Sequence, residues 1–476
     1  MNLFARHLFK VSLLLGMLFT FPDHDLIAQD VSTIYKTYCA GCHGAQLEGG
    51  SAGKLIKTDW GYGRGKGALH RNIRFGIPGT EMAAWGKILK DEEITSLVDF
   101  IITAQTTPIE TPRPIPENIT TKDYRLKVEQ LATEGLSTPW GIEFADPNRA
   151  LITERNGSIK WLINDQLDPV TIRGLPPTHT QSSTGGYMDI ALDPDYKENG
   201  WVYLAFSHTN GDIRSRDALA LTKIVRGRIE DHQWTDQEAI FEVADSLMVV
   251  RGNRWGGRLL FDREGFLYFT IGDMAKAMDS QDLSRATGKV FRIHPDGTIP
   301  SDNPFVREAN ALPAIYTIGN RNTQGLAQHP ETGELWSTDH GPMGGDELNR
   351  LKKGANYGWP VITYGVDYSG DIVSEKTHQE GMEQPIFQWT PSIGICPAEF
   401  ITGPLFEKWG NSLMIGSLAY EELYRLTIQG DEVADLELLM KGVGRVRDIK
   451  SGPDGAIYVL LNNPDKVLRI TPEIEP

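Results

Sequence analysis

The stretch Asp448-Ile-Lys-Ser-Gly-Pro-Asp-Gly-Ala-Ile-Tyr-Val459 places a tight Pro-Asp-Gly turn between two apolar runs. Short runs rich in β-branched and aromatic residues on either side of such a turn predict adjacent strands. Five further copies of this unit, one of them degenerate, begin at Gly141, Met188, Gly257, Gly325 and Leu405. Six copies, at roughly 60 residues per unit, predict an all-β six-bladed propeller over residues 123–476. A β-sandwich is the structural alternative, but it would not explain the recurring unit.

The N-terminal region has a different texture, and residues 39–43 read Cys-Ala-Gly-Cys-His. In this pattern two thioethers attach a haem c covalently and the adjacent histidine lies under its iron. Cys39 and Cys42 are therefore the predicted attachment sites, and His43 is the predicted proximal ligand. A redox dithiol or half of a zinc site is the alternative, and it is disfavoured because the chain has only three cysteines.

The opposite axial position needs a thioether or a second imidazole. Met82 lies in the loop 77–85, which resembles the axial-methionine loop of small class I cytochromes c. His70 is the competing ligand, but no comparable loop surrounds it. Apolar residues at helical spacing precede the haem motif and recur after Asp91-Glu-Glu. Residues 30–105 are therefore predicted to form a small all-α cytochrome c domain.

Two segments flank this predicted domain. Residues 1–28 carry basic residues and then an apolar run from Val11 to Phe21, which predicts an export signal and a periplasmic mature protein. An uncleaved anchor is the alternative. Residues 106–122 contain four prolines at close spacing and predict a semi-rigid linker. We expect this linker to hold the two domains near each other without packing them together.

The net charge of the chain disfavours two classes of binding partner. A formal net charge of −16 argues against nucleic acid and against anionic membrane surfaces, because both attract basic proteins. After residue 28 no apolar stretch approaches the length of a transmembrane helix, so no such helix is expected in the mature protein.

The longest distinctive block reads Ile318-Gly-Asn-Arg-Asn-Thr-Gln-Gly-Leu326, then Asp339-His-Gly-Pro-Met-Gly-Gly-Asp-Glu-Leu-Asn349, then Asn356-Tyr-Gly-Trp-Pro360. Together with Gly444-Arg-Val-Arg-Asp448, this block resembles the soluble glucose and aldose sugar dehydrogenases that depend on pyrroloquinoline quinone (PQQ). The resemblance covers most of residues 123–476, in order. It implies oxidation of a carbohydrate with PQQ and calcium. The electrons would then pass to the fused haem and on to a downstream acceptor.

The resemblance also implies roles for individual residues. Arg445 and Arg447 would bind the carboxylates of PQQ, an anionic cofactor that needs fixed cations. Arg321 and Asn322 would lie at the reactive quinone carbonyl, where a guanidinium stabilises developing negative charge. Tyr368 would contact the cofactor. The ligands expected for calcium, which prefers hard oxygen donors, are the carbonyls of Gly341 and Pro342 and, at a second site, Glu347 and Tyr357.

Three positions depart from the family pattern. Arg254 stands where the family has its catalytic histidine, and an arginine cannot accept the substrate proton. Thr184 and Ala419 stand where a cofactor-binding glutamine and lysine are usual. Two guanidinium groups, Arg254 and Arg321, would need an anion between them, which an acidic substrate could supply. His340 is the candidate for the missing base.

Two readings compete with the dehydrogenase. The propeller could be a catalytically altered ligand-binding module, or the haem could be the only active part of an electron-transfer protein. Adding PQQ and calcium to the protein and screening sugars for haem reduction would separate these readings.

Overall fold

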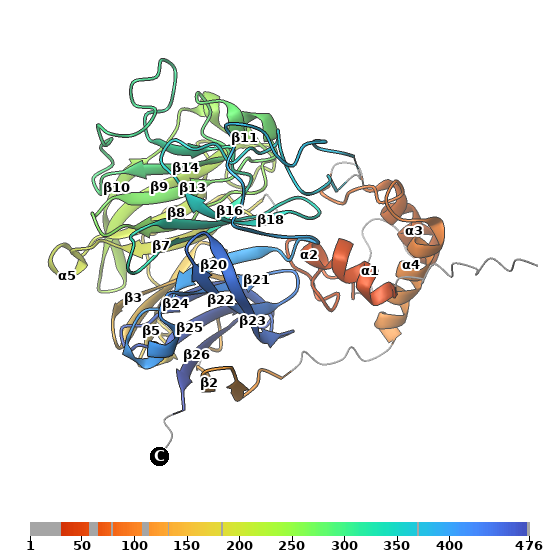
Figure 1. Ribbon diagram of the computed structural model, residues 1–476, viewed down its shortest axis with the longest axis horizontal. Coiled ribbons are helices and arrows are strands. Elements are labelled where there is room, and N and C mark those ends of the chain that lie inside the picture. The colour runs from red at the N-terminus through yellow and green to blue at the C-terminus, as the bar shows by residue number, and fades with distance from the viewer. Residues whose placement is uncertain are drawn as a thin grey trace, which may run out of the picture.

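The computed structural model describes residues 30–56, 65–77, 80–106, 114–131, 133–181, 184–368 and 371–473. The predicted export signal at residues 1–28 and much of the predicted linker lie outside these ranges. Within them, four helices form a small body beside a larger body of strands (Figure 1).

The helical body contains α1 (Val31–Tyr38), α2 (Ala40–His43), α3 (Gly65–Phe75) and α4 (Asp91–Thr106). Three acidic residues occupy the first turn of α4, where they oppose the positive end of the helix dipole. Ile34 and Tyr35 of α1 pack against Ile94, Leu97 and Ile101 of α4, and all five are buried. The two terminal helices expected from the apolar spacing are therefore present, and they enclose one core.

The strand body consists of six antiparallel sheets arranged as propeller blades. The first sheet has β3 (Pro139–Asp146), β4 (Arg149–Glu154), β5 (Ser158–Ile163) and β6 (Gln166–Leu167). The second has β7 (Tyr187–Leu192), β8 (Val202–His208), β9 (Leu219–Glu230), β10 (Gln233–Phe241) and the short β11 (Val249–Val250). The third has β12 (Leu259–Phe261), β13 (Leu267–Ile271), β14 (Lys289–Ile293) and β15 (Ile315–Ile318).

The remaining sheets follow the same order. The fourth has β16 (Thr323–Gln328), β17 (Leu335–Asp339), β18 (Asp346–Leu351) and β19 (Phe387–Trp389). The fifth has β20 (Ile395–Phe400), β21 (Ser412–Ser417), β22 (Glu422–Gln429) and β23 (Glu432–Lys441). Short helices connect some strands: α5 (Tyr196–Asn199), η1 (Asp245–Leu247), η2 (Ala277–Gln281) and η3 (Pro404–Trp409). The six-bladed propeller predicted from the repeats is confirmed.

The sixth sheet closes the ring with both ends of the propeller chain. Its order is β1 (Asn118–Thr120), β2 (Arg125–Gln130), β26 (Lys466–Pro472), β25 (Ile457–Asn462) and β24 (Arg445–Ser451). Strand β1 falls inside the segment expected to be linker, so the linker prediction is too long at its C-terminal end. Pairing β2 with β26 satisfies the backbone groups that an open ring would leave exposed at an edge.

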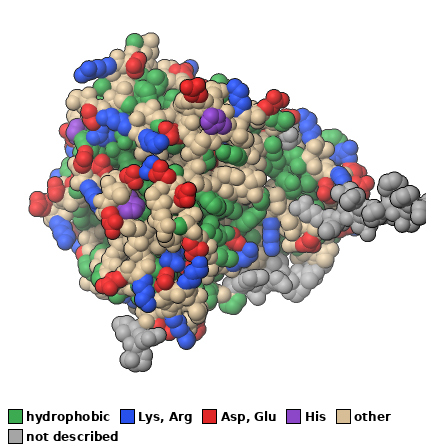
Figure 2. Space-filling model, in the orientation of Figure 1, with side chains coloured by type: hydrophobic (Ala, Val, Ile, Leu, Met, Phe, Trp, Pro, Cys, Tyr) green, Lys and Arg blue, Asp and Glu red, His purple; other side chains and the backbone are tan. Residues whose placement is uncertain are grey.

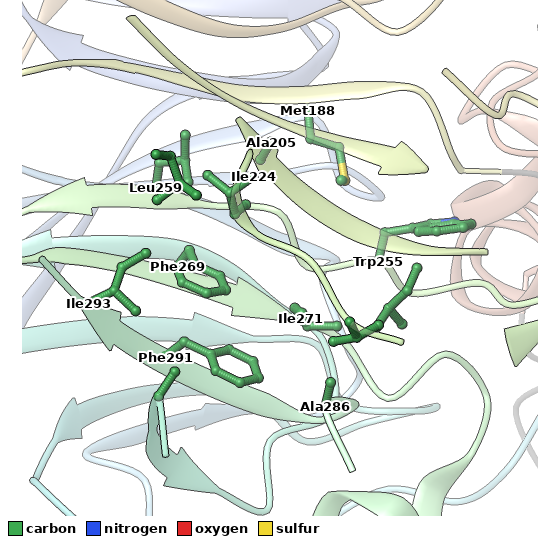
Figure 3. Close-up of a cluster of buried hydrophobic side chains, with 14 of the residues drawn as sticks. Met188, Ala205, Ile224, Trp255, Leu259, Phe269, Ile271, Ala286, Phe291 and Ile293 are labelled. Atoms are coloured by element: carbon green, nitrogen blue, oxygen red, sulfur yellow. The ribbon is translucent and has the colours of Figure 1, made fainter. Parts of the chain in front are cut away.

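Apolar side chains fill the space between neighbouring blades. Figure 3 shows this for the second and third sheets, where Ala205 and Ile224 face Phe269, Phe291 and Ile293. The Phe269 and Phe291 rings stack with centroids 4.9 Å apart. Each fully buried phenylalanine contributes about 1.5–3 kcal/mol, so the blade interfaces hold the ring rigid around its axis.

The helical body packs on the propeller, which contradicts the expectation of two domains that do not touch. Figure 1 shows α2 beside the strands. Arg445 Nη1 donates to the Gly41 carbonyl oxygen at 3.3 Å, and Asn463 Nδ2 donates to the Gly49 carbonyl oxygen at 3.1 Å. Met343 of the propeller packs against the helical core. The haem motif therefore faces the propeller directly.

The surface shows no dominant charge sign on the face in Figure 2, where acidic and basic side chains are interspersed. Among the helices in the described ranges, none combines the length and the apolar character needed to cross a membrane.

Candidate functional site

The haem motif adopts the geometry that its attachment chemistry needs. Cys39 ends α1 and caps α2, so Cys39 and Cys42 lie one helical turn apart with His43 directly after them. His43 Nδ1 lies 2.9 Å from the Gly53 carbonyl oxygen, so it must donate its hydrogen there. This bond fixes the tautomer whose Nε2 carries a lone pair, which is the ring state that ligates iron.

The two candidates for the sixth ligand are in different surroundings. Met82 packs against the apolar core that also receives Cys39. Its neighbour Glu81 lies near enough to Cys42 for its negative charge to raise the pKa of that thiol, alongside the larger effect of burial. His70 instead lies 3.4 Å from Asp91 through its Nε2 atom. The surroundings therefore favour Met82 over His70.

The candidate site of the propeller lies at the ends of its innermost strands. Strands β3, β7, β12, β16, β20 and β24 are neighbours around the axis. The residues singled out from the sequence lie at or just before these strands: Arg445 and Arg447 on β24, Arg321 and Asn322 before β16, and Arg254 before β12. The ring thus gathers groups that are more than a hundred residues apart in the chain.

Arg445 is buried and Arg447 is partly buried, and neither forms an ion pair with a described carboxylate. Arg445 Nη1 donates to the Leu418 carbonyl oxygen at 3.1 Å, and Arg447 Nη1 donates to Gln324 Oε1 at 3.3 Å. Burial lowers the pKa of Arg447 to about 10, and the positive charges of Arg445 and Arg258 act in the same direction. Buried cations held by neutral groups suit a polyanionic ligand.

Arg321 forms the adjoining part of the pocket. Its Nη1 donates to the carbonyl oxygens of Gly341 at 2.6 Å and His340 at 3.0 Å. Its Nε is buried and has no hydrogen-bond partner among the described residues. Thr184 Oγ1 and His340 Nε2 are left in the same state. Buried polar atoms without partners are rare in a closed protein interior, so these atoms fit a pocket that receives a polar ligand.

Three of the four residues expected to hold calcium lie around one cavity, and the fourth does not. Gly341, Glu347 and Tyr357 line one small cavity of about 20 Å³, together with Arg321 and Asp339. Pro342 is not part of that lining, and its carbonyl oxygen accepts from Ser392 Oγ at 3.0 Å. Burial raises the pKa of Glu347 to about 8 and that of Asp339 to about 6. A bound cation would stabilise the ionised forms of two such neighbouring acids.

Side chains alone do not complete a metal site here. Within the described ranges, no three His, Cys, Asp or Glu side chains converge on one metal position. A calcium ion in this cavity would therefore depend on carbonyl oxygens, which calcium readily accepts. The Gly341 oxygen accepts from Arg321 in this structure, so it would have to exchange that hydrogen bond for the ion.

Arg254 is paired within the protein. Its Nε donates to Asp273 Oδ1 at 2.7 Å, and Asp273 is fully buried. Trp359 Nε1 donates to the other oxygen of the same carboxylate at 2.8 Å. Burial and the charge of Arg321 lower the pKa of Arg254, which Asp273 opposes. Asp273 thus supplies an anion for Arg254 within the protein, and the acidic substrate stays a prediction that Arg254 itself does not require.

Tyr368 connects the pocket to the helical body. Its ring lies 5.9 Å from Arg321 Cζ and 6.5 Å, edge on, from the ring of Trp85. Trp85 follows Met82 in the same loop and is buried in the helical core. Both Tyr368 and Arg445, expected to contact PQQ, therefore also contact the domain that carries the haem motif.

The loop that contains Ala419 is also part of this domain contact. The side chain of Tyr420 lies close to Thr37 of α1. Burial raises the pKa of Glu421 to about 7, and the negative charge of Glu48 in the helical body adds to the effect. Ala419, which stands where a cofactor-binding lysine is usual, thus lies beside the propeller surface that contacts the haem domain.

Several pocket residues were missed from the sequence. Arg258 is buried and paired with Asp448 at 2.8 Å and with Asp189 at 3.6 Å. Asp273, Gln324 and Arg155 were also missed. Only Arg258 had a usable signal, because it directly follows the Gly256-Gly257 pair beside the displaced base position. The others acquire their roles from partners on different blades.

His340 does not fit the base role expected for it. Its Nδ1 lies 3.2 Å from Asn322 Nδ2, an amide nitrogen that can only donate. Its surroundings also keep it uncharged, because burial and then the charge of Arg321 lower its pKa to about 3.

Comparisons with known proteins give two family matches. Residues 136–469 match the glucose/sorbosone dehydrogenase family, and residues 28–101 match the family of cbb3-type cytochrome c oxidase subunit III. The aldose sugar dehydrogenase YliI of Escherichia coli (strain K12) is 34% identical over 351 residues, which cover 72% of this chain and 92% of that protein. Quinoprotein glucose dehydrogenase B of Acinetobacter calcoaceticus is 28% identical over 263 residues, covering 51% of this chain and 54% of that protein. A crystal structure of a glucose dehydrogenase superposes with a TM-score of 0.68 at 36% identity, covering 72% of this chain and 99% of that chain.

Proposed function

The chain belongs to the glucose/sorbosone dehydrogenase family, and we propose that it oxidises a sugar or related alcohol with PQQ and passes the electrons to its own haem. A cbb3-type cytochrome c domain precedes the propeller in the same chain. The observation that carries the proposal is the double contact of Arg445 and Tyr368, which lie in the expected cofactor pocket and touch the haem domain. Because electron transfer slows steeply with distance, this direct contact favours an internal relay.

The residues present fit PQQ. Arg445 is buried and Arg447 is partly buried. Neither cation has a carboxylate partner among the described residues, and both would bind the carboxylates of the cofactor. Arg321, whose Nε lacks a partner, would donate to an oxygen on which negative charge develops. When bound, PQQ would supply the quinone that accepts hydride from the substrate carbon.

We also propose that calcium belongs to this site. The partly buried Glu347 and the buried Asp339 lie around one small cavity that Gly341 also lines. The cavity, about 20 Å³, has room for a single ion or water molecule. Calcium would offset these carboxylates and the negative charge of the cofactor. Calcium removal with a chelator should therefore lower both PQQ affinity and thermal stability.

For the haem we propose His43 and Met82 as axial ligands. His43 has the tautomer that leaves Nε2 able to bind iron, and Met82 lies at the core that packs Cys39. Met82→Ala should convert the low-spin spectrum to a high-spin one and lower the reduction potential. His70→Ala is the control, because His70 pairs with Asp91, and it should leave the spectrum unchanged. The opposite pattern would assign the ligand to His70.

We propose the periplasm as the site of action and a respiratory-chain protein or cytochrome as the downstream electron acceptor. The haem-attachment motif and the apolar N-terminal run support export. Isolation of the expressed protein from the periplasmic fraction, followed by N-terminal sequencing, tests the location and the cleavage site near Ala28.

A second candidate function is favoured by one observation. Arg254 occupies the position of the usual base and is tied to Asp273, so this propeller could bind cofactor or sugar without turnover. In that case only the haem would be redox-active.

Reconstitution separates the two candidates. PQQ and calcium chloride are added to the full-length, haem-loaded protein, and aldoses and related alcohols are screened with an artificial dye as acceptor. The dehydrogenase predicts dye reduction that requires both PQQ and calcium. Saturable PQQ binding without dye reduction for any sugar would instead establish the binding module.

A further inference from the structure

Lys289, the first residue of β14, is a completely buried lysine that the proposed function does not use. Its Nζ donates to the carbonyl oxygens of Asp279 at 2.8 Å, Ser280 at 3.0 Å and Thr287 at 2.8 Å. It forms no ion pair with a described carboxylate. An ammonium has three donors and no acceptor, so these three carbonyls use its full capacity. The cation is therefore held by backbone oxygens, as a bound metal ion would be.

The three carbonyls belong to two segments of the connection between β13 and β14. Asp279 and Ser280 lie in η2, near its C-terminal end, where carbonyls lack partners within the helix. Thr287 comes later, directly before Gly288 and the start of β14. The two segments pack so closely that a side chain at Gly288 would collide with Ser280. Lys289 thus fastens η2 to the start of β14.

Gly288 connects the start of β14 to two residues of the pocket. Its N–H donates to the Gly272 carbonyl oxygen at 3.0 Å, and its carbonyl oxygen accepts from the Asn320 N–H at 3.2 Å. Asp273 directly follows Gly272, and Arg321 directly follows Asn320. The Asp273 N–H also donates to the Arg321 carbonyl oxygen at 2.8 Å. The position of Gly288 therefore constrains the backbone that carries both pocket side chains.

The helix η2 reaches the same pocket through its last residue, Gln281. Gln281 Nε2 donates to the Trp359 carbonyl oxygen at 2.7 Å. Trp359 Nε1 in turn donates to Asp273 Oδ2 at 2.8 Å. The Trp359 ring lies 5.2 Å from Arg321 Cζ. Both segments that Lys289 joins therefore lead to Asp273 and Arg321.

We propose that Lys289 is a positioning residue of the pocket, whose ammonium is a built-in cation that fixes Asp273 and Arg321 relative to each other. Asp273 holds Arg254 at the position of the usual base, and Arg321 is the residue that we expect at the quinone carbonyl. The inference therefore rests on the proposed function. A planar guanidinium cannot point donors at three oxygens around one atom, and an apolar side chain would leave all three without a donor.

The test removes the donors and keeps the length of the side chain. Lys289→Met is compared with the native protein through the indole N–H resonance of Trp359, in nitrogen-15 tryptophan-labelled protein without PQQ and with the haem reduced. Burial lowers the pKa of Lys289 to about 7, so the spectra are recorded at about pH 6, where the amine is protonated. Trp359→Phe identifies the resonance among the eleven tryptophans.

Lys289→Met should shift the Trp359 resonance toward that of an indole without a carboxylate partner, because η2 is no longer held beside Thr287. Lys276→Met is the matched control, since Lys276 is exposed in the same connection. It should leave the resonance unchanged. A folded Lys289→Met protein with the native resonance overturns the proposal, and so does an equal shift in Lys276→Met.

The native protein gives a result that does not depend on the folding of the variant. An ammonium that donates to three buried carbonyls exchanges its hydrogens slowly with water. In protein labelled at lysine and threonine, it should give a nitrogen–hydrogen correlation with cross-relaxation to Thr287. The absence of that signal at the same pH overturns the proposal even if Lys289→Met does not fold.

Activity separates this inference from the proposed function. In PQQ- and calcium-loaded protein, Lys289→Met should lower the dye-linked kcat by about 10- to 100-fold through misplacement of the pocket residues. The affinity for PQQ should change less, because Arg445 and Arg447 remain. An unchanged kcat with a shifted Trp359 resonance would overturn the positioning role. If the native protein turns over no substrate, the proposed function fails, and the Trp359 resonance still decides whether Lys289 fixes the pocket.

Discussion

The arginines gathered around the propeller axis differ in the partners that the protein gives them. Arg445 and Arg447, which we propose bind the cofactor, donate to carbonyl and amide oxygens and form no ion pair with a described carboxylate. Arg254, at the position of the usual catalytic base, donates instead to the buried carboxylate of Asp273. Beneath both, Arg258 is held by Asp448 and Asp189. An arginine that is paired with a carboxylate stabilises the folded protein. An arginine without such a partner is available to bind an anionic ligand.

The difference has a physical basis in desolvation. Moving a cation out of water costs several kcal/mol unless an opposite charge compensates for it. A carboxylate offsets this cost in the empty protein, as Asp448 and Asp189 do by raising the pKa of Arg258 against the effect of burial. For Arg447 burial prevails and its pKa is lowered. The folded protein therefore contains a cation whose desolvation cost is not compensated, and an anionic cofactor would offset that cost.

The largest expected effect comes from exchanging one arginine of each kind for methionine in cofactor-free protein. Arg258→Met leaves two buried carboxylates without their guanidinium and should lower the free energy of unfolding by about 3–5 kcal/mol. Arg447→Met removes an uncompensated cation and should change it by less than about 1 kcal/mol. Denaturant unfolding followed by tryptophan fluorescence measures both.

When PQQ is added, we expect the larger effect from Arg447→Met rather than from Arg258→Met. Arg447→Met should abolish the stabilisation that PQQ gives to the native protein, because it removes a carboxylate partner. Equal losses of stability for the two variants without PQQ would break the distinction between paired and unpaired arginines.

The second effect concerns the paired arginine on the substrate side. Arg254→His would place an imidazole beside Asp273, which can orient the ring so that it accepts a proton. Oxidation of neutral aldoses with PQQ and calcium should rise about 100-fold. Arg251→His is the matched control, since Arg251 pairs with Asp217 at the surface. A native protein that already matches the Arg254→His rate would show that Arg254 does not limit catalysis.

The smallest effect tests the acid nearest to the unpaired Arg445. Burial and Glu48 raise the pKa of Glu421 to about 7, so the folded protein keeps this proton to a higher pH than the unfolded chain. Stability should therefore fall as pH rises from about 5 to 7 and level off above, by on the order of 1 kcal/mol. Glu421→Gln should flatten that slope. An unchanged slope would place the ionisation elsewhere.

Much of this architecture could be predicted from the sequence. The recurring turn between apolar runs predicts the blades, since each blade repeats the same local pattern. The haem motif and the arginines at 321, 445 and 447 belong to short contiguous motifs, and the ring brings those motifs together around one axis.

What could not be predicted depends on contacts between distant segments. Asp273 neutralises Arg254 only because the turn after β13 meets the segment before β12. Gln324 looks like an ordinary strand residue until Arg447 and Asn322 are beside it. The docking of the haem domain through Gly41 and Trp85 leaves no periodic signal in either domain, so the linker prolines suggested separation instead.

Anaerobic stopped-flow mixing of the PQQ- and calcium-loaded protein with an oxidisable sugar, followed at the haem absorption bands, tests the central claim most directly. The direct contact between the pocket and the haem domain predicts reduction of the haem at a rate independent of protein concentration, as an internal transfer requires. A haem that stays oxidised while an added dye is reduced, or that is reduced at a rate proportional to protein concentration, would contradict the relay.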